Sequence, residues 1–243
     1  MRIHDMRLWI VGLTLILLFP LTARSEEDEK SSKKSQDIAL IFRIKGSVEI
    51  KRDGSEKWEK QVKRGVRLNS GDKLQTKKDG FVVIMFTDDK SQIKMKPDSE
   101  LHIQGDREKS TIIKRIGVEI GEMLISVDKP KGSLTVETPS AVAAIKGTRF
   151  ETAVSQDGQT DFIVTEGEIE IDSDNENKTA SQNHRAHIDS EGHITLTAIS
   201  DGQAQQLENS YSTIENGDSK TIRMTFRGPN GELKIVVIEA YQE

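Results

Sequence analysis

The sequence contains no cysteine among its 243 residues. The absence of thiols excludes disulfide bonds, a lipid-modified N-terminal cysteine and the cysteine ligands that structural zinc sites favour. Without disulfides, the chain has to draw its stability from a hydrophobic core. Its length suffices for one fair-sized domain or two small ones.

Aromatic residues are scarce as well, with seven phenylalanines, two tyrosines and two tryptophans. A carbohydrate-binding cleft usually presents several aromatic platforms, and this sequence offers few to build one from. The longest apolar run, residues 8–18 (LWIVGLTLILL), is well short of the roughly 20 residues that a membrane-spanning helix needs, which disfavours such a helix at the N-terminus.

That short apolar run has the surroundings of a secretory signal peptide. Arg2 and Arg7 precede it, Pro20 breaks it, and residues 23–25 (Ala-Arg-Ser) form a small-x-small cleavage site. Residues 1–25 are therefore predicted to be a signal peptide, with an uncleaved N-terminal anchor as the alternative. Residues 26–36 (EEDEKSSKKSQ) contain no apolar side chain and are predicted to be a disordered charged leader.

The net charge disfavours a nucleic-acid partner. The whole chain carries a formal charge of −5, and removal of residues 1–25 leaves 32 basic and 39 acidic residues, a net charge of −7. The phosphates of a nucleic acid would favour a basic surface instead.

Between Ile38 and Ile199 the dominant pattern is that of short β-strands. Apolar residues alternate with polar ones, which places one set on a core face and the other in water. Turn dipeptides with glycine separate these runs at short intervals. The pattern predicts an all-β fold, a sandwich, barrel or solenoid, over residues 37–199. The alternating apolar pairs are Val48 and Ile50, Ile93 and Met95, Leu101 and Ile103, Leu134 and Val136, and Ile169 and Ile171.

Two segments depart from this alternation. Residues 81–86 (FVVIMF) are apolar on both faces, which predicts a central strand that is covered on both sides. Residues 172–184 (DSDNENKTASQNH) are polar apart from one alanine and are predicted to form a long surface loop.

The last segment, residues 200–243, has a different character. Ser200 and Gln203 fit a helix capping box, and Leu207, Tyr211 and Ile214 follow at helical spacing, which predicts a short helix over residues 201–215. Residues 221–226 and 232–238 flank a Pro-Asn-Gly turn and predict a β-hairpin. Because an isolated hairpin is marginally stable, it is expected to form an extra layer on the β body or, alternatively, a docking edge for another chain.

The motifs of the β region, taken in order, resemble the FecR domain family. The resemblance covers about residues 40–172, and the Thr-Pro…Gly-Thr-x-Phe block carries most of its weight. The matching segments are GSVEI (46–50), Trp58, GVRL (65–68), GDKLQT (71–76), DGFVVI (79–84), PDSEL (97–101), GEML (121–124), TPSAVAAIKGTRFE (138–151) and EGEI (166–169).

The resemblance implies an extracytoplasmic all-β domain. In the iron-dicitrate regulator for which the family is named, this domain senses an outer-membrane transporter and signals through a membrane helix to a cytoplasmic segment that controls a sigma factor. Only seven residues precede the apolar run here. We therefore expect the outside domain to be exported on its own, without the cytoplasmic segment.

The block over residues 138–151 does not fit a phosphate cradle. A P-loop needs lysine after its second glycine and a helix behind it, whereas Lys146 precedes Gly147 and a strand pattern follows. We expect a structural role instead: small alanines (Ala141, Ala143 and Ala144) allow close packing, and Pro139 starts or edges a strand. The residues that match the family motif and are expected to be structural are Gly71, Asp72, Pro139, Gly147, Thr148, Phe150 and Gly167.

The alternative to a structural role for this block is a surface that binds a partner protein, formed by the cations Lys146 and Arg149. No metal site is predicted, because His184 and His187 would point to opposite faces of a strand, and His193 is a third, solvated histidine. The alternating acids Asp172, Asp174 and Glu176 lack the spacing of a calcium loop.

Catalysis is not predicted either, since the sequence lacks G-x-S-x-G and H-E-x-x-H. An undetected hydrolase using Glu166 or Asp89 is the least favoured hypothesis. No cofactor and no small-molecule substrate are expected.

The sequence thus predicts a non-enzymatic, exported envelope protein, periplasmic or on the cell surface, that serves as a protein-interaction or sensory module. Its expected partner is an outer-membrane receptor or a membrane-bound regulator. The alternative is a surface-exposed adhesin or structural envelope protein that binds host matrix or peptidoglycan with its charged faces.

Overall fold

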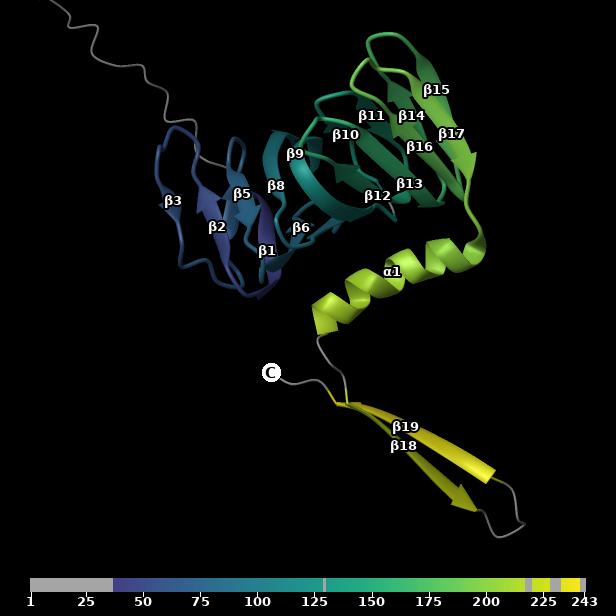
Figure 1. Ribbon diagram of the computed structural model, residues 1–243. Helices are drawn as coiled ribbons and strands as arrows, with labels where there is room; N and C mark the ends of the chain where they lie inside the picture. Colours follow the sequence, from purple (N-terminus) through teal and green to yellow (C-terminus); the bar gives the residue numbers. More distant parts are fainter. Residues whose placement is uncertain (1–36, 129, 217–219, 228–232, 241–243) are drawn as a thin grey trace, which may run out of the picture. The chain divides into compact units, whose positions relative to one another are not determined.

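The computed structural model describes residues 37–128, 130–216, 220–227 and 233–240, with side chains up to residue 213. Strands β1–β17 form two sheets that share one long strand, β9 (Figure 1). The first sheet, sheet A, has nine strands in the spatial order β4 (Arg67–Asn69), β1 (Asp37–Lys45), β6 (Phe81–Phe86), β7 (Gln92–Met95), β9 (Thr111–Ser126), β12 (Arg149–Val154), β13 (Thr160–Glu166), β16 (His184–Ile188) and β17 (Ile194–Ala198).

The second sheet, sheet B, uses the first part of β9. Its spatial order is β3 (Trp58–Glu59), β2 (Val48–Lys51), β5 (Lys73–Thr76), β8 (Glu100–Glu108), β9, β10 (Leu134–Glu137), β11 (Val142–Ile145), β14 (Glu168–Asp172) and β15 (Asn177–Ser181). Among the described strands every pairing is antiparallel except that of β9 with β10.

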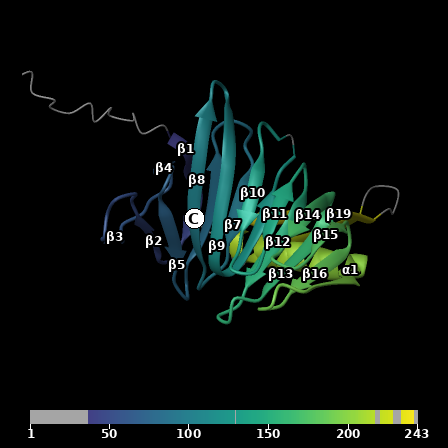
Figure 2. The same cartoon turned by 90° about the horizontal axis from the view of Figure 1, so that it is seen from above.

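Strand β9 passes from one sheet to the other. Residues 111–120 pair with β8 in sheet B, as the long pair of strands in Figure 2 shows, and residues 121–126 pair with β7 and β12 in sheet A. The change occurs at Gly121, whose φ of +98° is unfavourable for residues with a side chain. A Cβ at this position would also lie 2.5 Å from the Cα of Ser99. Glycine is therefore required where the strand crosses between the sheets.

One hydrophobic core fills the space between the two sheets. It contains residues from sheet A, such as Ile93 and Phe150, and from sheet B, such as Ile50 and Ile169, all of them fully buried. The five alternating pairs in the sequence lie on strands of this core, with the charged neighbours turned outward. The predicted all-β class is confirmed, and the arrangement of the strands, which the sequence left open, is that of two packed sheets. Core burial on both sheets accounts for the stability of the fold without disulfides.

Strand β6 is covered on both sides, as its sequence predicts. Val82, Ile84 and Phe86 face the core between the sheets. On the opposite face, Phe81 and Val83 pack with side chains of the C-terminal helix α1 (Asp201–Asn216), which lies on the outer face of sheet A. The helix thus supplies the second cover that a doubly apolar strand needs.

The predicted loop over residues 172–184 is wrong. This segment contains the edge strand β15, which pairs with β14 from Asn177 opposite Asp172 to Ser181 opposite Glu168. Ala180 alone faces the core, and the other side chains of β15 are at least partly exposed. The backbone of this edge strand forms its hydrogen bonds with β14, and only one small side chain is buried. Such a strand needs no alternation of apolar residues, so its composition resembles that of a loop.

Helix α1 begins with the predicted capping box. The backbone N–H of Gln203 donates to Ser200 Oγ (3.3 Å), and the backbone N–H of Ser200 donates to Gln203 Oε1 (2.9 Å). Each of these two side chains thus accepts a hydrogen bond from the backbone N–H of the other residue at the first turn.

The predicted hairpin is present as strands β18 (Lys220–Arg227) and β19 (Leu233–Ala240). Its register places Ile222 opposite Ile238 and Met224 opposite Val236. Whether the hairpin forms an extra layer or a docking edge depends on side chains that lie outside the described residues. The predicted signal peptide (1–25) and charged leader (26–36) also lie outside the described residues. Among the described residues, no helix is both long and apolar enough to cross a membrane.

Candidate functional site

The motif block over residues 138–151 forms a strand, a tight turn and a second strand. Val142–Ile145 is β11 of sheet B, and Arg149–Val154 is β12 of sheet A, so the turn at Gly147 (φ +69°) joins the two sheets. Ala141 and Ala143 are buried, as close packing requires, whereas Ala144 is exposed. Phe150 is fully buried and its ring centre lies 6.2 Å from that of Phe162.

Pro139 differs from its predicted position. It lies exposed in the turn between β10 and β11, and the strand begins three residues later at Val142. The turn is closed by Thr138, whose backbone N–H donates to the carbonyl of Ala141 (2.8 Å) and whose Oγ1 accepts from the Ala141 N–H (3.1 Å). Proline has no backbone N–H, and the turn is closed by the N–H groups of Thr138 and Ala141 instead, so proline is tolerated at this position.

Two other motif residues, Gly71 and Asp72, lie at the turn between β4 and β5. The buried carboxylate of Asp72 accepts hydrogen bonds from the Arg52 guanidinium (2.7 Å) and from the backbone N–H groups of Asn69 (3.0 Å) and Asp53 (3.2 Å). These bonds tie two neighbouring turns of sheets A and B together, which is a structural use of the carboxylate.

Gly167 and Thr148 lie against one another at a second turn. Gly167 has a φ of +80°, and a Cβ there would lie 2.8 Å from the carbonyl oxygen of Gly147. Thr148 is buried beside it. The geometry of this contact leaves no room for a side chain at position 167.

Arg149, one of the two predicted partner-surface residues, lies in a shallow cleft of about 260 Å³ on the outer face of sheet A, beside α1. We call it the helix-side cleft. Three cations line it, Lys90, Lys94 and Arg149, together with two acids, Asp128 and Glu208. The remaining lining residues are Gln92, Leu124, Ser126 and Ser212. Lys146 is exposed on the adjoining turn but does not line the cleft.

Helix α1 reaches the cleft through Glu208. Its Oε2 lies 3.6 Å from a guanidinium nitrogen of Arg149, and its Oε1 accepts a hydrogen bond from Thr165 Oγ1 (2.8 Å). Asp128 lies 3.9 Å from Arg149 on the other side and is 83 % exposed. Both ion pairs of Arg149 are long and solvated, so each contributes at most about 1 kcal/mol.

A buried polar cluster anchors the same helix next to the cleft. Tyr211, fully buried, donates to Glu151 Oε2 (2.6 Å). Lys96 Nζ lies 3.3 Å from the same oxygen, 2.6 Å from Glu122 Oε2 and 4.3 Å from the centre of the Tyr211 ring. Burial raises the pKa of Glu151 despite these favourable partners, and burial together with Glu151 raises the pKa of Tyr211. Tyr211 therefore remains a hydrogen-bond donor at every physiological pH.

The three histidines are placed apart from one another. His187 Nδ1 lies 2.9 Å from Asp161, His193 Nδ1 lies 3.3 Å from Asp189, and His184 contacts the carbonyl of Gln182. No group of three potential metal ligands comes together among the described residues. Of the acids in the predicted loop, Glu176 binds Lys178 and the backbone N–H of Ile194, and these hydrogen bonds lower its pKa.

The two acids considered for hydrolysis also lie apart. Glu166 is exposed at the end of β13, whereas the Asp89 side chain is buried in an ion pair with Lys114. The sequence did not lead us to predict Lys114, the partner of Asp89. Its alternation with Ile112 and Ile116 was a signal for an inward-facing lysine.

Comparisons with known proteins bear on the β domain. Residues 72–170 match the family model described as FecR protein. A comparison with curated proteins found no match. Two crystal structures of a protein described as a putative anti-sigma factor from Parabacteroides distasonis align with 16 % and 15 % identity. Each alignment has a TM-score of 0.48 and covers 65 % of this chain, and 68 % and 69 % of the other chain.

These structural likenesses are too distant to assign a function. The family match contains DKLQT (72–76), DGFVVI (79–84) and the Thr-Pro…Gly-Thr-x-Phe block, in the order that the sequence predicted. Residues 72–170 of the chain therefore match the FecR family model, and this match covers the middle of the β domain.

Proposed function

We propose that this protein is a non-enzymatic interaction module of the bacterial cell envelope, exported from the cytoplasm, whose FecR domain binds a regulatory or receptor protein. The observation that carries the proposal is the helix-side cleft, where Arg149 of the FecR motif block lies with Lys90 and Lys94. The signal-like N-terminus and the net negative charge support export and a protein partner.

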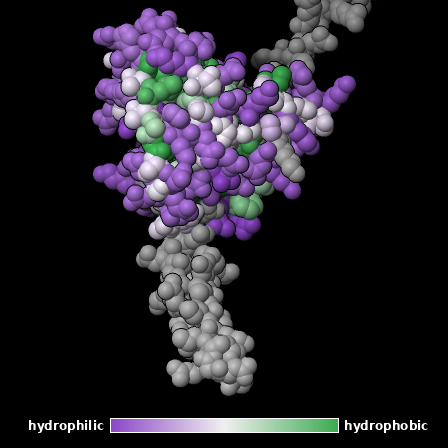
Figure 3. Space-filling model, turned by 90° about the vertical axis from the view of Figure 1, so that its right-hand side faces the viewer, coloured by the Kyte–Doolittle hydropathy of each residue, from purple (hydrophilic) through white to green (hydrophobic). Residues whose placement is uncertain are grey.

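The chemistry of the cleft favours an acidic partner segment. Arg149 presents a planar guanidinium whose present partners are long and partly solvated. A carboxylate that approached between Arg149 and the two lysines would gain charge-assisted hydrogen bonds, which are stronger than the pairs it replaces. The face of the molecule in Figure 3 is mostly hydrophilic, with apolar residues in small groups, as expected for contacts of a polar kind.

The test is photo-crosslinking in intact cells. A photoreactive amino acid replaces Gln92 inside the cleft or, in the control, Val142, which is 41 % exposed on sheet B. We expect position 92 to capture one envelope protein repeatedly and position 142 to capture none. Equal capture from both positions, or no envelope protein at position 92, would contradict the proposal.

The location is tested separately. Cell fractionation with protease treatment of whole cells distinguishes a periplasmic module, which is protected, from a surface adhesin, which is cleaved. Recovery of the full-length chain in the cytoplasm would contradict the export that we propose.

A further inference from the structure

A lysine occupies a core position of the long strand β9. Along this strand Ile112, Lys114 and Ile116 face inward and alternate with outward-facing residues. The Lys114 side chain is 1 % exposed, and its Nζ lies 5.4 Å from the centre of the Phe86 ring. A lysine is almost never buried in this way unless specific groups compensate its charge.

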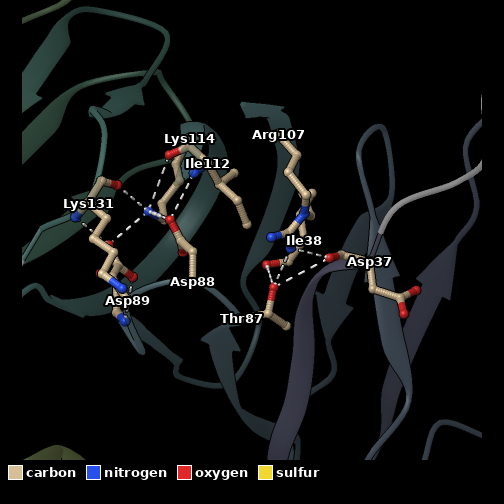
Figure 4. A network of polar contacts seen from close by, with 10 residues as sticks. Asp37, Ile38, Thr87, Asp88, Asp89, Arg107, Ile112, Lys114 and Lys131 are labelled. Carbon is tan, nitrogen blue, oxygen red and sulfur yellow. Dashed lines mark hydrogen bonds and ion pairs between the residues drawn. The ribbon is translucent and has the colours of Figure 1, made fainter. Parts of the chain in front are cut away.

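Two buried carboxyl groups meet this lysine. Lys114 Nζ lies 2.8 Å from Asp88 Oδ2 and 2.8 Å from Asp89 Oδ2, and these two side chains are 0 % and 1 % exposed (Figure 4). Nζ also donates to the carbonyl oxygens of Lys131 (3.0 Å) and Ile112 (3.3 Å). An amine and two carboxyl groups therefore share one water-poor space between β6, β9 and the segment before β10.

The two carboxyl groups are held differently. Asp89 accepts from the backbone N–H groups of Ser91 (2.9 Å) and Lys131 (3.2 Å). Burial opposes its ionisation, but the hydrogen bonds from Lys114 and Ser91 outweigh this effect and lower its pKa. Asp88 accepts on Oδ2 from the Ile112 N–H (2.9 Å), whereas its Oδ1 is buried without a hydrogen-bond partner among the described residues.

An unpaired, buried carboxylate oxygen is unfavourable because it has lost its hydration. The cost would vanish if Oδ1 left as water and Lys114 Nζ took its place in an amide. The remaining oxygen, Oδ2, would keep its hydrogen bond from Ile112, and the new amide N–H would point to Asp89. The buried charges of Lys114 and Asp88 would also be removed.

We propose that Lys114 and Asp88 form an intramolecular isopeptide bond, with Asp89 as the group that transfers the protons. This inference does not rest on the proposed function. The bond would join the turn after β6 covalently to β9.

The reaction balances without any co-reactant. In the first step a proton passes from the Lys114 ammonium to the Asp88 carboxylate across the 2.8 Å contact between them. The amine then attacks Cγ of Asp88, and the C–N bond forms. Asp89 accepts the second amine proton and delivers it to the departing hydroxyl, the C–O bond breaks, and one molecule of water leaves.

The surrounding contacts hold these groups in position. The residue before Asp88, Thr87, accepts a hydrogen bond from the Arg107 guanidinium (2.7 Å), and its Oγ1 lies 3.2 Å from the carbonyl of Ile38 (Figure 4). Asp89 is fixed on the other side by two backbone donors. Well-oriented intramolecular reactions reach effective concentrations on the order of 10⁵ M, and the fixed contact between Lys114 and Asp88 favours the reaction in the same way.

The test is the intact mass of the purified, denatured chain, with both termini identified by sequencing. Denaturation releases an ion pair but retains a covalent bond. We expect the mass to be about 18 Da below that of the sequence, the loss of one water when two held groups condense. A mass equal to that of the sequence would overturn the proposal, whatever the variants show.

Tryptic peptides locate the bond. The linked product joins residues 79–90 to residues 110–115, because an acylated Lys114 is no longer cleaved. Fragmentation within the first peptide separates Asp88 from Asp89. A bond to Asp89 would overturn the assignment of the reacting carboxyl group.

Two variants and a control test the roles. Lys114→Arg keeps the positive charge but should show the full sequence mass, and Asp89→Asn should lose most of the bond because an amide does not accept the proton. Lys96→Arg, at the other buried lysine–carboxylate cluster, should keep the lower mass. Complete bond formation in Asp89→Asn would contradict the role of Asp89.

Discussion

Arg149 shows how a single residue can join the family motif to the surface of the molecule. Its neighbour Phe150 faces the core, so the alternation of β12 turns the guanidinium outward, beside α1. Lys146, three residues earlier, lies on the turn and outside the cleft. The sequence predicted that the two cations were available, but their separation depends on where β12 begins.

Gly167 provides a test of backbone geometry at the residue scale. Gly167→Ala should lower the free energy of unfolding by about 2–4 kcal/mol, because it combines a left-handed conformation with a Cβ 2.8 Å from a carbonyl oxygen. Gly54→Ala is the matched control: its φ is +71° and its Cβ would meet nothing within 4 Å. Denaturant unfolding of both variants gives the comparison, and equal losses would contradict the close contact.

Glu151 gives the stability a pH dependence of known sign. Burial raises the pKa of Glu151 in the folded chain, so on acidification the folded chain takes up this proton at a higher pH than the unfolded chain does. The buried charge of Glu151 destabilises the fold at neutral pH. This destabilisation diminishes as the pH falls through the raised pKa toward the ordinary value of 4.5. The wild-type chain should therefore gain stability relative to Glu151→Gln as the pH falls through this window. Thermal unfolding of both chains along a pH series measures this difference, and a loss would show the sign to be wrong.

The buried lysine marks the limit of prediction at this scale. The alternation of β9 indicates that Lys114 faces inward, but its partners come from the turn after β6, more than twenty residues earlier. Sequence patterns identify a face of a strand. They do not show which distant turn meets that face, because that depends on the order of the strands in the sheets.

At the scale of elements, the relation between β6 and α1 was half predictable. The apolar sequence of β6 requires two covers, and the capping box and spacing of α1 predict a helix with one apolar face. That these two elements meet was not evident, since more than a hundred residues separate them. The misassigned loop at β15 has the opposite cause: an edge strand receives its position from its neighbour, and its own sequence needs little apolar character.

Tyr211 tests the docking of the helix. Tyr211→Ala should lower the free energy of unfolding by about 3–5 kcal/mol, since it removes a fully buried ring and leaves Glu151 without its donor. Asn209→Ala, on the exposed side of the same helix, is the control. Hydrogen exchange of the α1 amides should accelerate in the Tyr211 variant alone, and an unchanged rate would mean that the helix does not depend on this anchor.

The capping box makes a smaller contribution at the same scale. Ser200→Ala should lower the free energy of unfolding by about 1 kcal/mol through loss of the bond to the Gln203 N–H. Ser200→Asp should retain most of this stability, because aspartate is an equally good cap. Denaturant unfolding measures both variants, and equal losses in the two would contradict the capping geometry.

At the scale of the whole molecule, the β domain over residues 37–198 is a sandwich with two different outer faces. Sheet A carries α1 and the helix-side cleft, whereas the strands of sheet B alternate toward water with polar and charged residues such as Arg115 and Glu170. The all-β class followed from alternation alone. The asymmetry between the faces did not, because it arises from the position of a helix that follows the β domain in the sequence.

The most direct test of the proposed binding site is the yield of crosslinks from position 92 after charge reversal. The account predicts that Lys90→Glu combined with Arg149→Glu lowers the yield about tenfold or more, through repulsion of an acidic partner. Arg115→Glu, an exposed cation on sheet B, should leave it unchanged. An undiminished yield in the double variant, with the fold retained, would contradict the central claim that the cleft beside α1 binds the partner.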